Sequence, residues 1–261
     1  TDLVAGSSGG TDSNVYLWDR DAPAASAIRL VSHTPAGATV RSNSECRWMS
    51  PSADGRYISY TSDSTDLIPG PGGEPLLFQL YQWDREAPPA TANRLVSHAL
   101  TGENQPGDHG TDIPSSSADG RFVAFASAAT DLTGPATGGA WDNVFVWDRD
   151  SPSDIAIRLV SHAPSSATSR GDNSSQGPVI SGDGAHVAYR SFATDLVTGA
   201  GGTQRWNAYL WDRLAPTASA NHLLSRSAGE ELMRGNGDSY VAAVSHDGRL
   251  VGFSSTSTDL V

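Results

Sequence analysis

The stretch SADGRFVAFAS at residues 117–127 has the pattern of a β-hairpin. Small polar residues lead into an Asp-Gly pair, and six residues with high strand preference follow it. Glycine supplies the positive φ that such a tight turn needs. The Asp-Gly pair recurs along the chain, beginning at Asp54, Asp119, Asp183 and Asp247. The hairpin is therefore one part of a repeat, and the sequence predicts an all-β fold.

Two further tripeptides recur in the same register at spacings of about 64 residues. Trp-Asp-Arg begins at Trp18, Trp83, Trp147 and Trp211. Thr-Asp-Leu begins at Thr1, Thr65, Thr130, Thr194 and Thr258. We therefore expect a single domain over residues 1–261, built from repeats that begin near Thr1, Thr65, Thr130 and Thr194.

Each repeat contains four short segments with strand character, which we name A to D in chain order. Strand A precedes Asp-Gly, and strand B follows it at 57–62, 122–127, 186–191 and 250–255. Strand C ends at the Trp of Trp-Asp-Arg, and strand D is predicted at 29–33, 94–98, 158–162 and 222–226. Four short antiparallel strands in each repeat predict the blades of a β-propeller.

The phase of the repeat predicts how the propeller closes. The chain opens before a strand C and closes after a strand B, which gives sixteen strands. We expect the last A-B hairpin to join the first C-D hairpin in one composite blade, because this pairing hides two sheet edges. The prediction is a closed ring of four blades. Two alternatives stay open: a slice of a longer tandem array, or two chains that share one eight-bladed ring.

The hairpin at 117–127 and the segment NVFVWDR at 143–149 resemble the TolB-like, or PD40, WD40-like propeller repeat. The resemblance covers nearly the whole chain and implies a propeller fold rather than a particular function. Ala185 departs from the pattern, since arginine follows Asp-Gly in the other repeats. TolB-like propellers have more than four blades, so a four-bladed ring would be an unusual member.

Composition excludes several classes of function. The formal net charge is -12 and the isoelectric point is near 4.8, which argues against nucleic acid and anionic membrane surfaces as partners. All 17 basic residues are arginine, so lysine-based chemistry within the chain is excluded. No apolar run is long enough to cross a bilayer. We expect a secreted or extracellular protein, and arginine without lysine suggests a bacterial source.

One polar position recurs just before strand A and predicts a metal site. Strand A is the innermost strand of a propeller blade, so these side chains should ring the mouth of the central channel. Oxygen ligands in that arrangement suit Ca²⁺ or ordered water. The alternative, which we favour, is that each side chain caps its own turn. The candidate ligands are Asn43, Asp108, Asp172 and Asn236.

The long B-C loops, at 3–13, 67–78, 132–142 and 196–206, share one rim with the D-A loops. Long loops on a rigid scaffold commonly carry binding residues, so we place a ligand site on this long-loop face. Residues that break the repeat are the better candidates, because packing already explains those that keep it. The candidate binding residues are Trp48, His109, Trp141, Arg205 and Trp206.

Repeated positions favour structural roles. The Ser-His pairs recur at His33, His98 and His162, whereas a catalytic triad needs one unique nucleophile and one base. We expect these histidines to form hydrogen bonds between strands or to the next blade. The tryptophans of Trp-Asp-Arg are predicted to pack first and to stack on sugars only as an alternative. Cys46 is predicted to be a small buried hydrophobe rather than a reactive thiol.

The leading functional hypothesis is a non-catalytic extracellular module for binding or scaffolding. It would engage a protein partner, or pack into an assembly of its own copies, through the long-loop face. A carbohydrate-binding lectin is the alternative, although the loops are too unlike one another for four equal sugar sites. A hydrolase or lyase with a site at the channel mouth is less favoured, and no catalytic residue or required cofactor is assigned.

Overall fold

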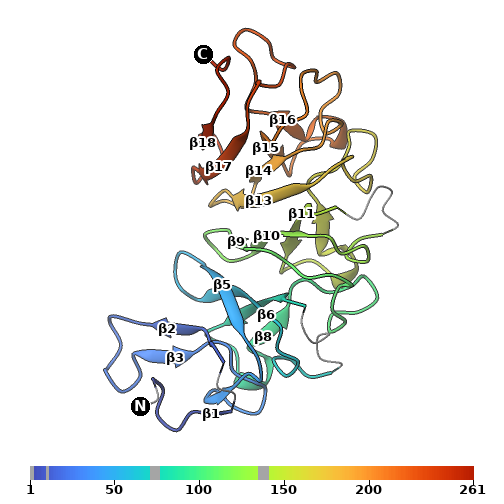
Figure 1. Ribbon diagram of the computed structural model, residues 1–261. Helices are drawn as coiled ribbons and strands as arrows, with labels where there is room; N and C mark the ends of the chain where they lie inside the picture. The colour runs from blue at the N-terminus through green and yellow to red at the C-terminus, as the bar shows by residue number, and fades with distance from the viewer. Residues whose placement is uncertain (1–2, 10–11, 71–76, 135–140) are drawn as a thin grey trace.

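The computed structural model describes residues 3–9, 12–70, 77–134 and 141–261. Its core is a row of five antiparallel sheets that follow one another in chain order (Figure 1). Three sheets have four strands each, and a two-stranded sheet lies at either end. Every strand of the repeat pairs with its neighbour in sequence, so each four-stranded sheet is one propeller-type blade in the order A-B-C-D.

The strands lie where the repeat predicts them. Strand A is β5 (Cys46–Pro51), β9 (Ser115–Ser116), β13 (Ser175–Ile180) and β17 (Ser239–Val244). Strand B is β6 (Tyr57–Ser62), β10 (Phe122–Ser127), β14 (His186–Ser191) and β18 (Val251–Ser255). Strand C is β2 (Tyr16–Trp18), β7 (Gln79–Asp84), β11 (Asn143–Asp148) and β15 (Asn207–Asp212). Strand D is β3 (Ile28–Leu30), β8 (Asn93–Leu95), β12 (Ile157–Leu159) and β16 (Asn221–Leu223).

A few short elements accompany the blades. The strands β1 (Ser8–Gly9) and β4 (Val40–Arg41) form a small parallel pair. Single turns of 3₁₀ helix precede strand D in three repeats, as η1 (Pro89–Thr91), η2 (Ser153–Ile155) and η3 (Thr217–Ser219). None of these helices among the described residues is long and apolar enough to span a membrane.

The Asp-Gly turn is held by a serine two residues before the aspartate. The Ser117 hydroxyl donates to Asp119 Oδ1 at 2.6 Å and accepts the Phe122 N–H at 3.0 Å. Gly120 has a φ of +66°, which explains why glycine follows the aspartate. The same two serine bonds recur in the other three repeats, so Ser-x-Asp-Gly acts as one unit.

Neighbouring blades pack face to face and bury the strands between them. Every residue of β6 and β10 is buried, because each of these strands is covered by sheets on both sides. Backbone hydrogen bonds also link the A-B turns of successive blades. The Ala53 N–H donates to Ala118 O, Ala118 to Gly182 O, and Asp183 to His246 O, at 2.8 to 2.9 Å. The same link therefore recurs at the three interfaces where both sheets have an A-B turn, and it helps to fix how one blade sits on the next.

The closed four-bladed ring is wrong for this structure. The first C-D hairpin (β2, β3) and the last A-B hairpin (β17, β18) are separate two-stranded sheets, so the composite blade does not form. They lie at opposite ends of an open arc (Figure 1). The physical reason lies in how the blades stack: the row of sheets does not curve enough over four repeats to bring its two ends together (Figure 1).

Strand D is shorter than predicted, with three residues in each repeat. The serine two residues after strand D forms hydrogen bonds with the start of strand C. Ser161 Oγ accepts the Val144 N–H at 3.0 Å and donates to Asn143 Oδ1 at 3.1 Å. The residue that follows each of these serines forms only an isolated bridge toward the D-A loop.

Candidate functional site

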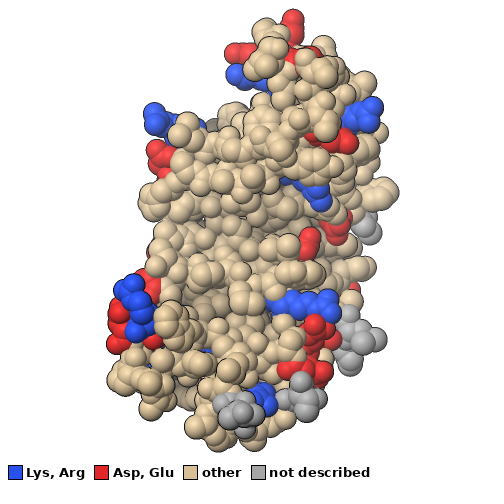
Figure 2. Space-filling model, turned by 60° about the vertical axis from the view of Figure 1, so that its left-hand side comes forward, with Lys and Arg blue, Asp and Glu red and all other residues tan. Residues whose placement is uncertain are grey.

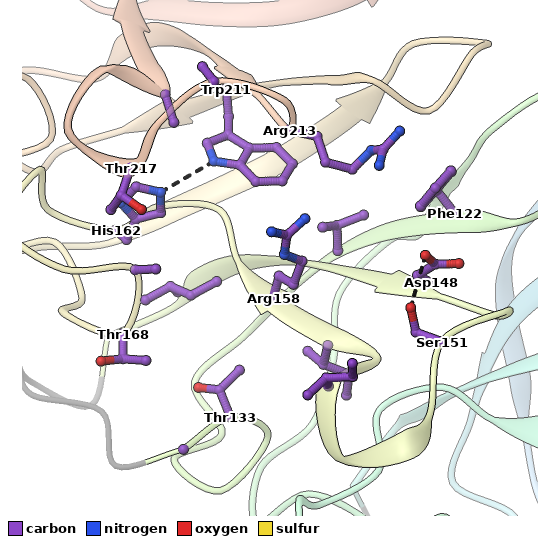
Figure 3. A pocket seen from close by; sticks show the side chains of 18 of the residues that line it. Phe122, Thr133, Asp148, Ser151, Arg158, His162, Thr168, Trp211, Arg213 and Thr217 are labelled. Carbon is purple, nitrogen blue, oxygen red and sulfur yellow. Dashed lines mark hydrogen bonds between the residues drawn. The ribbon is translucent and has the colours of Figure 1, made fainter.

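A pocket of about 470 Å³ lies between the second and third complete blades (Figure 3). Its walls come from β12 of one blade and from the end of β15 and the turn after it in the next. Residues of the long-loop face, such as Thr133 and Thr168, line one part of it. Residues of the C-D turns, such as Ser151 and Thr217, line another. The pocket therefore extends along the outer side of the interface between the two rims.

A buried imidazole and a buried indole form one wall of this pocket. Trp211 Nε1 donates to His162 Nε2 at 3.3 Å (Figure 3). His162 Nδ1 lies 3.0 Å from the Ala163 carbonyl oxygen, so the ring proton resides on Nδ1 and Nε2 is the acceptor. Burial lowers the pKa of His162, and the carbonyl opposes this shift only in part. The ring is neutral near pH 7 with both nitrogens engaged, so it is not available as a general base.

Arg158 supplies an unengaged positive charge in the same pocket. It lies on β12 between the buried Ile157 and Leu159, and it is exposed. Figure 3 shows its side chain between the His162–Trp211 pair and Asp148. Within the described part of the chain, Arg158 forms no ion pair or side-chain hydrogen bond. A cation beside apolar walls is a suitable contact for an anionic group on a ligand.

Two other charged groups along the pocket, Asp148 and Arg213, already have partners. Asp148 receives two bonds from Arg121, at 2.8 and 2.9 Å, and one from the Ser151 hydroxyl. Burial opposes ionisation of Asp148, but these bonds outweigh it and hold its pKa below the usual range. Arg213 lies 4.4 Å over the Phe122 ring and donates to the Gly184 carbonyl oxygen. These bonds belong to blade packing, which leaves Arg158 and the exposed Asp154 as the charged pocket residues, among those described, that can change partners.

The first blade interface repeats this arrangement on a smaller scale. A pocket of about 360 Å³ is lined by Arg29, His33 and Trp83, and Trp83 Nε1 donates to His33 Nε2 at 3.2 Å. Arg29 is exposed, like Arg158, and no ion pair to it is found among the described residues. Two of the interfaces therefore combine a pocket, an indole–imidazole pair and a free arginine.

The middle interface differs. Arg94 lies 5.3 Å over the Trp147 ring and donates to the Arg149 carbonyl oxygen at 3.2 Å. Trp147 is fully buried, and its Nε1 has no hydrogen-bond partner in the described structure. Arg94 thus covers the indole, whereas its equivalent Arg158 at the neighbouring interface has no ion pair among the described residues. The expected bond from histidine to the next blade is thus confirmed for His33 and His162, whereas for His98 the structure shows no bond to Trp147.

The predicted calcium ligands are each engaged within their own blade, where the segment before strand A binds the segment after strand B. Asp108 Oδ1 accepts the Thr130 N–H at 2.6 Å, and Asp131 Oδ1 accepts the Asp108 N–H at 3.0 Å. We call this reciprocal pair the Thr-Asp clasp. It recurs at the other three positions, where Asn43, Asp172 and Asn236 bind Thr-Asp at Thr65, Thr194 and Thr258. The sequence favoured a cap on each residue's own turn, whereas the clasp is a bond to a segment 22 residues further along the chain.

The clasp also explains the leucine of Thr-Asp-Leu. A Cβ added to Gly107, the residue before Asp108, would lie 2.6 Å from Leu132 Cδ2, so glycine gives the leucine its space. Among the described residues, no group of three or more His, Cys, Asp or Glu side chains is placed to hold a metal ion. A Ca²⁺ site that draws on all four repeats stays a hypothesis.

Two of the predicted binding residues belong to aromatic clusters with arginine. The Trp206 ring is 5.5 Å from Phe192, and Arg190 lies 4.8 Å over it and 4.9 Å over Tyr240. Trp48 lies 6.3 Å from Phe78, with Arg47 4.5 Å over the Phe78 ring. Trp48 has a φ of +38° at a β-bulge in β5, a conformation that an L-residue rarely adopts.

The remaining predicted binding residues lie apart from these clusters. His109 contacts Asp108 at 3.3 Å. Trp141 is 48% exposed, and Arg205 is exposed next to Trp206. Apart from the neighbours Arg205 and Trp206, these residues come from different repeats, and no contact between them joins the five into one site in the described structure. The sequence did not indicate the pocket at Arg158, because its residues occupy repeated positions and were assigned to packing.

The Ser-His pairs and Cys46 have the structural roles that the sequence predicts. Ser161 and its equivalents fix the start of strand C, as described above. Cys46 is 5% exposed, and burial raises the pKa of its thiol. The Ser42 and Ser62 hydroxyls contact its sulfur at 3.5 and 3.3 Å. This environment keeps the thiol protonated near pH 7 and therefore a weak nucleophile.

Charge on the surface is mixed in spite of the net charge of -12. Figure 2 shows basic and acidic side chains side by side at several places, with broad uncharged areas between them. Arg47 and Glu45 form one of the ion pairs of the described residues, at 2.5 Å. A single arginine can therefore attract an anionic group locally although the whole chain is acidic.

Comparison with known proteins finds similarity at the level of fold. No family model matches the chain, and no curated protein does. TolB from Acinetobacter baumannii is similar over 92% of this chain, with 12% identity and a TM-score of 0.44. The β-propeller domain of the Trilobed protease from Pyrococcus furiosus is similar over 70%, with 12% identity and a TM-score of 0.40. The resemblance to TolB-like propellers is confirmed, and it concerns the fold alone. The chain spans 42% and 43% of those two proteins.

Proposed function

We propose that this chain is a non-catalytic binding module that holds a segment of a protein partner in the pocket at Arg158. The guanidinium would bind a carboxylate of the partner, and the apolar walls would cover the side chain next to it. The observation that carries the proposal is an exposed arginine without an ion pair, among the described residues, in a pocket of about 470 Å³. A location outside the cytoplasm is part of the same proposal.

The shape and chemistry of the pocket support a peptide-like ligand. It lies along the junction of two blades, and its lining combines apolar side chains such as Ile157 and Leu159 with polar and charged ones such as Thr168, a combination that ligand sites use. The neutral His162–Trp211 pair contributes a flat wall that stays fixed when a ligand enters. The second pocket, at Arg29, gives the same surface a second place to contact an extended partner, and two linked contacts raise the overall affinity.

Selection from a random peptide library on the immobilised chain tests the proposal. The enriched peptides should carry an acidic residue beside an apolar one. Fluorescence anisotropy should show that Arg158→Gln weakens binding of an enriched peptide by about 10-fold or more, because a hydrogen bond to a charged group contributes about 1.5–3 kcal/mol. Arg20→Gln is the matched control, since Arg20 is a highly exposed arginine paired with Asp21. Equal affinity of Arg158→Gln and the control would refute the proposal.

A further inference from the structure

Three copies of one pentapeptide, Arg-Leu-Val-Ser-His, lie at three successive interfaces between blades. They begin at Arg29, Arg94 and Arg158. At the two outer interfaces the arginine is exposed and lines a pocket. At the middle interface Arg94 is half-buried, and its guanidinium carbon lies 5.3 Å from the centre of the Trp147 ring. Arg94 therefore lies over an indole whose equivalents line the two pockets.

This arrangement leaves a donor and an acceptor of the middle interface unpaired. Trp147 is fully buried, and its Nε1 has no partner in the described structure. His98 Nδ1 lies 3.1 Å from the Ala99 carbonyl oxygen, so the ring proton resides on Nδ1 and Nε2 is an acceptor. No bond to His98 Nε2 is found among the described residues. The equivalent groups of the neighbouring interfaces bind each other at 3.2 and 3.3 Å. Because a buried N–H without a partner is unfavourable, the same bond would stabilise the middle interface in a second arrangement.

Two positions of the repeat explain why the middle interface differs. In the first and third complete blades, an asparagine lies opposite the tryptophan in the C-D ladder and accepts a bond from a tyrosine. Its amide also donates to two backbone carbonyl oxygens at or near the histidine of the previous repeat, at 2.8 to 3.3 Å. The second complete blade has Ile157 and Phe125 at these positions, and neither side chain can form such bonds. The segment that carries His98 therefore lacks this clamp to the next blade.

We propose that the middle interface is a third binding site for an acidic, partly apolar segment of a protein partner, and that Arg94 closes it when no ligand is bound. The proposal rests on the proposed function, because it takes the ligand class from there. A carboxylate of the ligand draws Arg94 away from Trp147, and the indole N–H then donates to His98 Nε2. The site then has the arrangement that Figure 3 shows at the neighbouring interface, an exposed arginine beside a bonded histidine and tryptophan. Arg94 exchanges its contact with an uncharged ring for a charge-assisted hydrogen bond.

Three equivalent sites favour an extended partner with acidic residues at intervals. The three arginines occupy the same position of strand D, in β3, β8 and β12, so they recur once in each blade. Linked contacts of this kind raise the overall affinity. The middle site must first release Arg94 from the indole and from the Arg149 carbonyl oxygen. It is therefore filled after the two open pockets, because the competent state is the minor one.

The indole N–H signals in a ¹H–¹⁵N spectrum give the first test, without any ligand. Trp-to-Phe variants assign the signals of Trp83, Trp147 and Trp211. In Arg94→Gln the Trp147 signal should move downfield toward the other two, because its N–H becomes bonded to His98. Arg158→Gln is the matched control and should leave the Trp147 signal in place.

A double variant tests the same change from the other side of the interface. Phe125→Tyr combined with Ile157→Asn gives the second complete blade the residues of its neighbours, and it should move the Trp147 signal in the same direction as Arg94→Gln does. A Trp147 signal that stays in place in both variants overturns the proposal.

Titration with N-acetyl-glutamyl-leucine amide tests the binding step. This probe should move the Trp147 signal toward its position in Arg94→Gln, at a higher concentration than it needs to move the Trp211 signal. The glutaminyl analogue is the control and should need about 10-fold more or worse, since it lacks the charge-assisted bond. A probe that moves the Trp211 signal and leaves Trp147 unchanged overturns this proposal while the proposed function stands. A probe that moves neither signal contradicts both.

Discussion

The indole–imidazole pairs give a quantitative prediction, because equivalent tryptophans form a hydrogen bond at some interfaces and not at another. Trp83 and Trp211 each donate to a histidine, at 3.2 and 3.3 Å. Trp147 is as deeply buried, but its Nε1 has no partner in the described structure. The change from Trp to Phe removes the same atoms at all three positions, so the loss of packing is similar. The difference between the losses of unfolding free energy therefore measures the contribution of the hydrogen bond.

The magnitude follows from the two bonding states. In Trp211→Phe the bond is lost and His162 Nε2 stays buried without a donor, which costs about 1–3 kcal/mol beyond packing. In Trp147→Phe no bond is lost, and a buried unpaired N–H disappears. We therefore expect Trp83→Phe and Trp211→Phe to lower the unfolding free energy by about 1–3 kcal/mol more than Trp147→Phe.

Urea denaturation at pH 8, where the histidines are neutral in both states, measures these differences through the transition midpoint and slope. Trp18→Phe is an additional control, because Trp18 is 65% exposed and its truncation should change little. Equal losses for the three buried tryptophans, or a larger loss for Trp147→Phe, would show that these hydrogen bonds do not distinguish the interfaces.

Three further predictions follow from other contacts of the repeat. Burial lowers the pKa of His33, His98 and His162, so the unfolded chain binds protons before the folded chain as the pH falls below about 6.5. The unfolding free energy should therefore decrease from pH 7 to pH 5, by at most about 1.4 kcal/mol per histidine for each pH unit. A urea midpoint that stays constant over that range would contradict this prediction. In the Thr-Asp clasp, Asp108→Asn should change the urea midpoint little, because asparagine occupies the equivalent positions 43 and 236. Asp108→Ala should lower the unfolding free energy by about 1–3 kcal/mol, and equal effects of the two substitutions would argue against the clasp. Gly107→Ala should destabilise the fold through its 2.6 Å approach to Leu132, while Gly134→Ala, which meets open space, should not; thermal melting of both variants decides this.

The sequence was most informative where one local motif determines one local structure. The Asp-Gly turn predicts strand B correctly at residues 57–62, because the turn, the serine that caps it and the strand that follows are neighbours in the chain. Closure of the ring was predicted wrongly for the opposite reason. It depends on the angle at which blades stack, and this angle is the sum of many contacts between repeats that no single motif encodes.

The candidate site was hidden by repetition itself. Arg94 and Arg158 begin the same pentapeptide, Arg-Leu-Val-Ser-His, yet Arg94 lies over Trp147 while Arg158 stands free in a pocket. A cation–π contact contributes only about 0.5–2 kcal/mol, so the arginine positions over the indole and away from it differ little in free energy. Two states so similar in free energy are separated by the surroundings of the whole interface rather than by the pentapeptide. The same repeated residue can therefore form a packing contact at one interface and line an open pocket at the next.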